Sequence, residues 1–300
     1  MRARVVALAG VLLATGCGSG SSARSSSAAG TLKALSEASG LKTVALTPGD
    51  ADFSPGPVRF SFLVVADNGR LVEKPTAQVW VAHGFKDKPY THAVAHLESM
   101  GVPGVSDTAG VPSIYVTHVR APRTGTYWVF VKPQGSSIAG LGNFVVRKRS
   151  YSPEVGARAP DSSTPTLAST HGRLSVLSTA PHPDRALYTH SVAQELAAHR
   201  PFVVTFATPK FCTSRTCGPV VDVVSRVRRQ AAHSGVDFIH VEVYKNNNPA
   251  QGYNHWMKQW GLESEPWVFL VGRDGRIKAK FEGAISVDEL RSAVASQLSN

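Results

Sequence analysis

The sequence is short of acidic residues and of long apolar runs. It holds 21 aspartates and glutamates against 32 lysines and arginines, which gives a formal net charge of +11. No nucleic-acid-binding motif accompanies this charge, so we expect a basic surface that suits an anionic membrane or wall polymer and no nucleic-acid partner. The apolar run at residues 5–14 is too short to cross a bilayer as a stable helix.

Cysteine is equally scarce, with three in 300 residues: Cys17, Cys212 and Cys217. Residues 1–16 have the basic start, short apolar run and small residues of a secretory signal. The motif A-T-G-C that ends at Cys17 resembles the bacterial lipobox, whose cysteine is lipid-modified and becomes the mature N-terminus. This resemblance implies a protein anchored to the cell membrane through Cys17, on the extracytoplasmic face. An ordinary secreted protein is the alternative.

Residues 17–42 begin as a stretch rich in serine and glycine and are predicted to form a flexible tether. After the tether, residues 43–149 contain short alternating segments separated by Gly, Pro and Asp turns. Such a series of strands predicts an all-β immunoglobulin-like sandwich, and it resembles the modules of that type in bacterial envelope lipoproteins. Because we find no core periodicity before residue 50, we expect deletion up to that point to leave a folded protein.

Four histidines of residues 43–149 raise the question of a metal site. They are His83, His92, His96 and His118. Without cysteine or methionine nearby they make a thin ligand set for copper, and histidine on a sandwich surface is usually only an exposed polar residue. We therefore predict no metal site and no cofactor.

Strands and helices alternate in residues 150–300, which begin with a Pro/Ser-rich linker at 150–165. A short apolar run at 202–204 predicts a buried strand, and valines at helical spacing in 220–227 predict an amphipathic helix. Cys212 and Cys217 lie in the loop between these two elements. A helix N-terminus stabilises a thiolate, which is the reactive form of cysteine.

The motif C-G-P that begins at Cys217 resembles the C-G-P-C active-site segment of the thioredoxin superfamily. Downstream, Glu265-Pro266 before an apolar strand resembles the cis-proline of that family, and the D-G turn at 274–275 resembles the turn of its terminal hairpin. The resemblance implies an α/β thioredoxin-like fold for the last 140 residues or so. Two positions depart from the family: Val220 stands in the place of its second cysteine, and Thr205 in the place of its buried acid.

The resemblance implies thiol–disulfide exchange. With Cys17 lipidated, Cys212 and Cys217 are the only pair left, and outside the cytoplasm we expect them to form a disulfide. Cys217 takes the place of the thiol at the helix N-terminus, and Cys212 is its resolving partner. Pro266 in the cis form places the backbone of Glu265 against an incoming peptide, so the expected partners are envelope proteins with thiols or disulfides.

Three other functions remain open for the cysteine pair. A structural disulfide in a non-catalytic binding module is the first, so the choice between enzyme and scaffold stays open, with the oxidoreductase preferred. The C-x4-C spacing also resembles one type of peroxiredoxin, in which Cys212 is the peroxidatic thiol; Pro209 and Thr205 stand in each other's expected places there. Copper delivery of the Sco type needs a histidine where this chain has Ser264.

Overall fold

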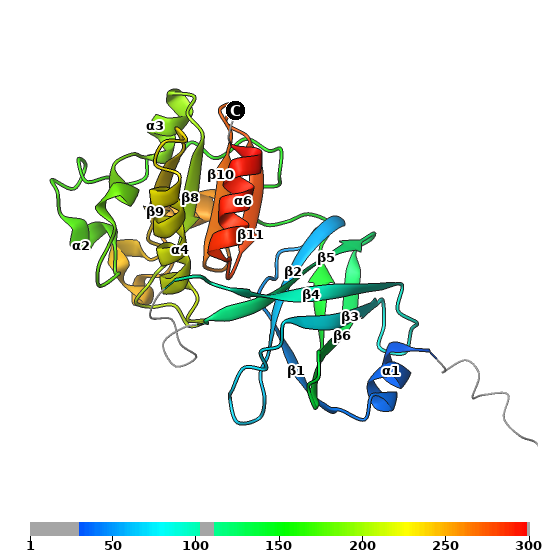
Figure 1. Ribbon diagram of the computed structural model, residues 1–300. Coiled ribbons are helices and arrows are strands. Elements are labelled where there is room, and N and C mark those ends of the chain that lie inside the picture. Colours follow the sequence, from blue (N-terminus) through cyan, green and yellow to red (C-terminus); the bar gives the residue numbers. More distant parts are fainter. Residues whose placement is uncertain (1–29, 103–110, 299–300) are drawn as a thin grey trace, which may run out of the picture.

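The computed structural model describes residues 30–102 and 111–298, which form two units in contact (Figure 1). The first unit is a closed barrel with the strand order β1-β2-β5-β4-β3-β6-β7. Its strands are β1 (Lys42–Pro48), β2 (Gly56–Val64), β3 (Thr76–Ala82), β4 (Thr91–Ser99), β5 (Ser113–Ala121), β6 (Gly125–Pro133) and β7 (Ile138–Val146). Neighbouring strands are antiparallel except at the seam, where β1 runs parallel to β7.

Two glycines in β7 make the seam of the barrel possible. A Cβ atom at Gly140 would lie 2.8 Å from a methyl carbon of Leu46, and one at Gly142 would lie 2.8 Å from the Cβ of the same leucine. Any larger residue would therefore push β1 away from β7. Leu46 is itself buried in the barrel core, together with aromatic residues such as Phe60 and Phe62. Closure leaves β1 and β7 with no free edge along their paired segments.

The segment expected to be a tether contributes a helix to this unit. Helix α1 (Leu32–Ala38) begins after Thr31, whose side chain accepts a hydrogen bond from the Ala34 amide. Leu32 is fully buried against the barrel, and its amide donates to the carbonyl of Asp87 at 2.8 Å. The later part of residues 17–42 is thus packed onto the barrel.

The second unit is built on a four-stranded sheet with the order β11-β10-β8-β9. Its strands are β8 (Phe202–Phe206), β9 (Asp237–Val241), β10 (Trp267–Val271) and β11 (Ile277–Glu282). Strands β8 and β9 are parallel, whereas β10 is antiparallel to both β8 and β11. The elements around the sheet are α2 (Leu174–Leu177), α3 (Val192–Ala197), α4 (Cys217–Gln230), α5 (His255–Gln259), α6 (Val287–Gln297) and the 3₁₀ turns η1 (Arg185–Tyr188), η2 (Lys245–Asn247) and η3 (Pro249–Gln251).

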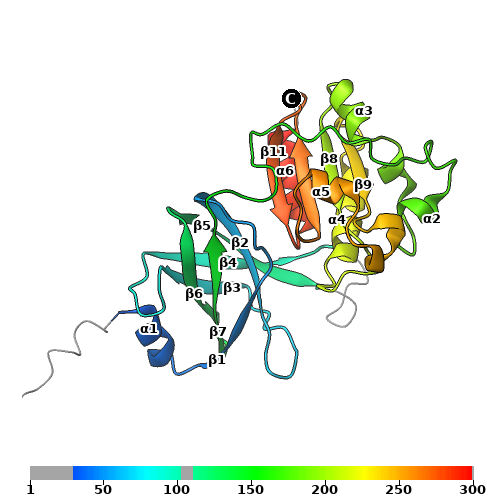
Figure 2. The ribbon, with the colours of Figure 1, turned by 180° about the vertical axis from the view of Figure 1, so that it is seen from behind.

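Both faces of this sheet are buried. All five residues of β8 are buried, and alternate residues belong to different cores: Val203 packs with α4 and α6, and Val204 packs with residues of α3 and α5. Figures 1 and 2 show α4 and α6 over one face, with α5 on the other. A strand covered on both sides reads as a continuous apolar run, as residues 202–204 do.

The predicted fold class is wrong. The chain was expected to be an immunoglobulin-like sandwich followed by an α/β thioredoxin-like fold, but it holds a closed seven-stranded barrel and a second sheet with few helices. The alternation of apolar and polar residues along a strand is the same in a sandwich and in a barrel, because each strand buries one face in both. Of the helices described in the second unit, only α4 and α6 are longer than six residues.

The two units are joined by buried polar contacts. Arg59 of β2 donates to Glu289 of α6 at 2.6 Å and lies 3.2 Å from Asp50. Glu282 at the end of β11 accepts from the backbone amides of Ala51 and Asp52 at 2.6 and 2.8 Å. Arg59 is only 12% exposed, so these charges are shielded from water and fix the position of the barrel against the sheet.

Within residues 30–102 and 111–298, no helix is long and apolar enough to cross a membrane. The predicted signal segment and Cys17 lie outside the described residues.

Candidate functional site

The two cysteines meet at the start of α4. Cys217 is the first residue of the helix and is completely buried, whereas Cys212 lies in the loop after β8 and is partly exposed. Both are thiols in this structure. The residue before the helix, Thr216, makes no side-chain cap; instead, the amide of Cys217 donates to the sulfur of Cys212 at 3.3 Å. The sulfur therefore accepts from one of the amides that have no partner within the helix at its start.

The surroundings of the two thiols give them opposite acidities. Hydrogen bonding from the Cys217 thiol, helped by the Ser214 hydroxyl and the amides of Cys217 and Thr216, lowers the pKa of Cys212 to about 5 although burial opposes it. Burial raises the pKa of Cys217 far above its usual range, and the hydrogen bond to Cys212 and the charge on Cys212 act in the same direction. The pair thus consists of an accessible thiolate and a buried, protonated thiol.

A carboxyl group lies close enough to the thiols to interact with them. Charge on Glu265 raises the pKa of Cys217, and the Cys212 thiolate raises that of Glu265. Burial is the largest cause of the raised pKa of Glu265, and a hydrogen bond from Tyr253 opposes it. Tyr253 and Tyr244 both donate to this carboxylate, the Tyr244 bond being 3.4 Å long, and their rings stack with centroids 5.4 Å apart.

The backbone around this carboxyl has the conformation that the sequence predicted. The Glu265–Pro266 peptide bond is cis. Thr205 is fully buried, and among the described residues its hydroxyl has no hydrogen-bond partner. No acid therefore occupies the strand position of Thr205. The acid beside the thiols comes from Glu265 instead.

From the sequence, only the backbone of Glu265 was expected to take part in the site, as a contact for an incoming peptide; the role of its side chain was missed. The sequence interpretation also missed Tyr244 and Tyr253. A glutamate directly before the expected cis-proline was a signal that could have been used. The two tyrosines offered none, because η2 and η3 separate them in sequence and they meet only in the folded chain, through an isolated bridge and the stacking of their rings.

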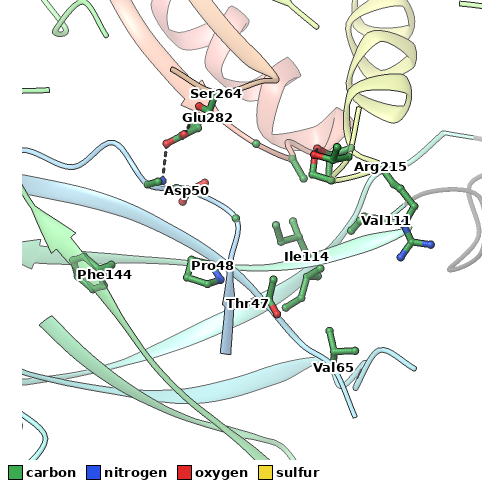
Figure 3. Close-up of a pocket in the computed structure, with 18 of the residues that line it drawn as sticks. Thr47, Pro48, Asp50, Val65, Val111, Ile114, Phe144, Arg215, Ser264 and Glu282 are labelled. Atoms are coloured by element: carbon green, nitrogen blue, oxygen red, sulfur yellow. Dashed lines mark hydrogen bonds between the residues drawn. The ribbon is translucent and has the colours of Figure 1, made fainter. Parts of the chain in front are cut away.

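A cavity of about 670 Å³ opens between the barrel and the second unit, beside the thiol loop (Figure 3). Its lining includes residues 213–216, which lie between the two cysteines, together with Glu265 and Glu282. The facing side belongs to the barrel unit and includes Val65, Val111 and Ile114, which are labelled in Figure 3. The cavity and the thiol site therefore share residues.

The histidines considered for a metal site lie apart from the thiols. His92 stacks on Trp80 and His83 on Tyr90, with centroids 4.8 and 4.7 Å apart. Another cluster of the described residues has metal-ligand chemistry, formed by His190, Glu195 and Asp237. Arg200 donates to Glu195 at 2.7 Å from two nitrogens and lies 3.4 Å from Asp237, so a guanidinium already pairs with these carboxylates.

Comparison with known proteins gives one weak structural likeness. No family model matches the chain, and no curated protein matches it. Among solved structures, the chain is similar to a thiol:disulfide interchange protein of the thioredoxin family from Chlorobium tepidum, with 16% identity and a TM-score of 0.33. The match covers 48% of this chain and 98% of that one. This is a weak likeness over part of the chain, and the chemistry of the site rests on the residues described above.

Proposed function

We propose that the cysteine pair carries out thiol–disulfide exchange, with Cys212 as the attacking thiolate and Cys217 as the resolving thiol. The observation that carries the proposal is the asymmetry of the pair. One sulfur is accessible and has a pKa of about 5, and its partner, five residues away, is buried with a raised pKa. A purely structural pair has no use for a stabilised thiolate.

The exchange proceeds in two displacements. The Cys212 thiolate attacks one sulfur of a partner disulfide; that S–S bond breaks, a mixed disulfide forms, and the other partner sulfur leaves and takes up a proton. Cys217 then loses its proton and attacks the Cys212 sulfur, so the mixed disulfide breaks and the Cys212–Cys217 bond forms. The partner leaves as a dithiol with two electrons from the pair. The reverse sequence oxidises a dithiol partner.

Glu265 is the group we assign to the proton of Cys217. The buried thiol must be deprotonated before it can attack, and Thr205 cannot accept a proton at the position where an acid was expected. The Glu265 carboxylate interacts with both thiols, and Tyr253 and Tyr244 hold it in place. A carboxyl with a raised pKa is suited to general-base work near neutral pH.

The roles of the two cysteines are the reverse of those suggested by the C-G-P motif. Cys217 occupies the helix N-terminus, but it is completely buried and cannot meet a bulky disulfide. Cys212 lies outside the helix, but its sulfur accepts a hydrogen bond from the amide of Cys217 at the start of α4. The dipole of α4 therefore stabilises the thiolate of the accessible cysteine.

The location of the protein follows from the predicted lipid anchor and is proposed on the sequence alone. Acylation of Cys17 would hold the chain at the extracytoplasmic face of the cell membrane, where its partners would be envelope proteins with thiols or disulfides. No cofactor is needed, because the two sulfurs exchange electrons directly with the partner.

Trapping of mixed disulfides tests the function. Reduced protein is mixed with a chromogenic aromatic disulfide and with a disulfide-bonded peptide. Cys217→Ser should form a long-lived mixed disulfide through Cys212, and Cys212→Ser should form none while the protein remains folded. If the pair is a structural bridge, neither variant will trap a partner, and reduction will cost roughly 2–4 kcal/mol of stability with no gain in reactivity.

A further inference from the structure

We propose that the cavity between the two units binds an apolar side chain close to the reactive cysteine of a polypeptide partner, and that the barrel supplies the apolar wall. This inference rests on the proposed exchange function and adds a substrate preference to it. It also gives the barrel a part in the reaction, as half of the binding site.

The wall on the barrel side holds an apolar patch that is open to an occupant, with Thr47, Asp50, Asn143 and Arg147 also lining that side. The patch includes Leu63, Val65, Leu71 and Val145, none of which is fully buried. Val145 is 46% exposed, so its surface is free to be covered by an occupant of the cavity. Covering this wall with an apolar side chain would remove its surface from water, which is favourable.

The opposite wall ties the cavity to the thiol chemistry. Residues 213–216 connect Cys212 to Cys217 and line the cavity, and Glu265 of the same unit also lines it. An occupant of the cavity therefore touches the residues next to the attacking sulfur. In an extended chain successive residues are about 3.3 Å apart, so a side chain one to three positions from a bound cysteine lies within about 10 Å of it.

The cavity is formed in advance of binding. The pair between Arg59 and Glu289, and the bonds from the amides of Ala51 and Asp52 to Glu282, hold its two walls together. Its volume of about 670 Å³ falls in the range typical of ligand sites. Binding to a site of this kind does not require the free energy that is needed to bring two separate walls together.

The occupant to which we commit is part of a polypeptide chain. A free apolar molecule would fill the cavity without engaging the thiol, whereas a polypeptide joins an apolar side chain and a reactive sulfur in one ligand. Because the cavity adjoins the thiol loop, only a polypeptide can fill the cavity and reach the thiol at the same time. The expected partner segment therefore carries leucine, isoleucine, valine or phenylalanine next to its cysteine.

The test compares exchange rates for two disulfide-bonded peptides that differ only beside the cysteine, one with leucines and the other with serines. The chromogenic aromatic disulfide serves as a substrate that does not need the cavity. Wild-type protein should react with the leucine peptide roughly tenfold faster or more, as expected for one buried aliphatic side chain. Val145→Asp and Val65→Asp should lose this preference and keep the rate with the aromatic disulfide.

Val94→Asp is the matched control. Val94 lies on β4, is 41% exposed and does not line the cavity, so its replacement should leave both peptide rates unchanged. Equal rates for the two peptides with wild-type protein would overturn the inference while leaving exchange itself intact. Loss of reaction with every disulfide would instead overturn the proposed function. Binding of an apolar dye that Val145→Asp abolishes, with no peptide preference, would show a small-molecule site and also overturn the inference.

Discussion

The hydrogen bonds at Cys212 should be visible in its titration. Because the pKa of Cys212 is about 5, alkylation by iodoacetamide should rise with pH through a midpoint near pH 5 and level off above it. The Cys217 thiol is the largest cause of the lowered pKa, so Cys217→Ala should move the midpoint upward further than Ser214→Ala does. Mass spectrometry of pulse-alkylated protein measures both. A midpoint near pH 9 in the wild type would contradict the assigned contacts.

The side chain of Glu265 can act in two ways that predict opposite results. Its negative charge raises the pKa of Cys217, so an electrostatic effect alone would make Glu265→Gln speed up resolution. As a general base, it should instead make that variant resolve the mixed disulfide roughly 100-fold more slowly, with the first displacement unchanged. Stopped-flow release of the chromogenic thiolate, followed by the decay of the mixed disulfide, separates the two steps. The exposed neighbour Glu263 provides the control Glu263→Gln.

At the scale of elements, β1 is the strand on which the barrel depends. It pairs with β2 on one side and with β7 on the other, and Leu46 fills the space that two glycines leave. Deletion of residues 1–50 should therefore open the barrel, contrary to what the sequence led us to expect. Deletion of residues 1–29 keeps every described element and is the control. Near-ultraviolet circular dichroism and thermal melting compare them; equal melting temperatures would show that the barrel does not need β1.

At the scale of the whole molecule, a buried carboxyl of the barrel, next to the residues that contact the second unit, makes stability depend on pH. Asp50 accepts hydrogen bonds from the Ser61 amide and hydroxyl at 2.7 and 2.6 Å, and its burial raises its pKa from 3.8 to about 7. An acid with a higher pKa in the folded chain stabilises it most at low pH, and that contribution is lost as the pH rises from about 4 to about 7.

Asp50→Asn should remove this dependence because the amide stays neutral and still accepts from Ser61. The free energy of unfolding of the variant minus that of the wild type should therefore be larger at pH 8 than at pH 4.5. Urea denaturation at both pH values measures the difference in free energy of unfolding. A difference that is the same at the two pH values would mean that Asp50 is ionised throughout the range.

The parts of the candidate site that are close in sequence could be read from it. Both cysteines were placed in the loop between a buried strand and a helix; Cys212 does lie between β8 and α4, whereas α4 begins earlier than expected and Cys217 is its first residue. The cis bond before Pro266 was expected from the family resemblance and is present. The parts that could not be read involve distant residues: Glu265 meets Tyr253 across a helix, and the cavity joins residues 213–216 to barrel residues that lie from about 70 to about 170 positions earlier.

Taken alone, the sequence determined where several strands of the barrel after residue 50 and the strand and helix around the cysteines form, because apolar spacing and turn residues act over a few positions; α1 and β1 were not read from it. It also placed Cys212 and Cys217 five positions apart, and their pairing stays a prediction that depends on lipidation of Cys17. Tertiary structure decided that seven strands close into a barrel, since that depends on Gly140 and Gly142 meeting Leu46 nearly a hundred positions away. It also decided which thiol reacts, because burial of Cys217 and exposure of Cys212 are set by how α4 packs on the sheet, and burial, more than position in a motif, controls where the charge can reside.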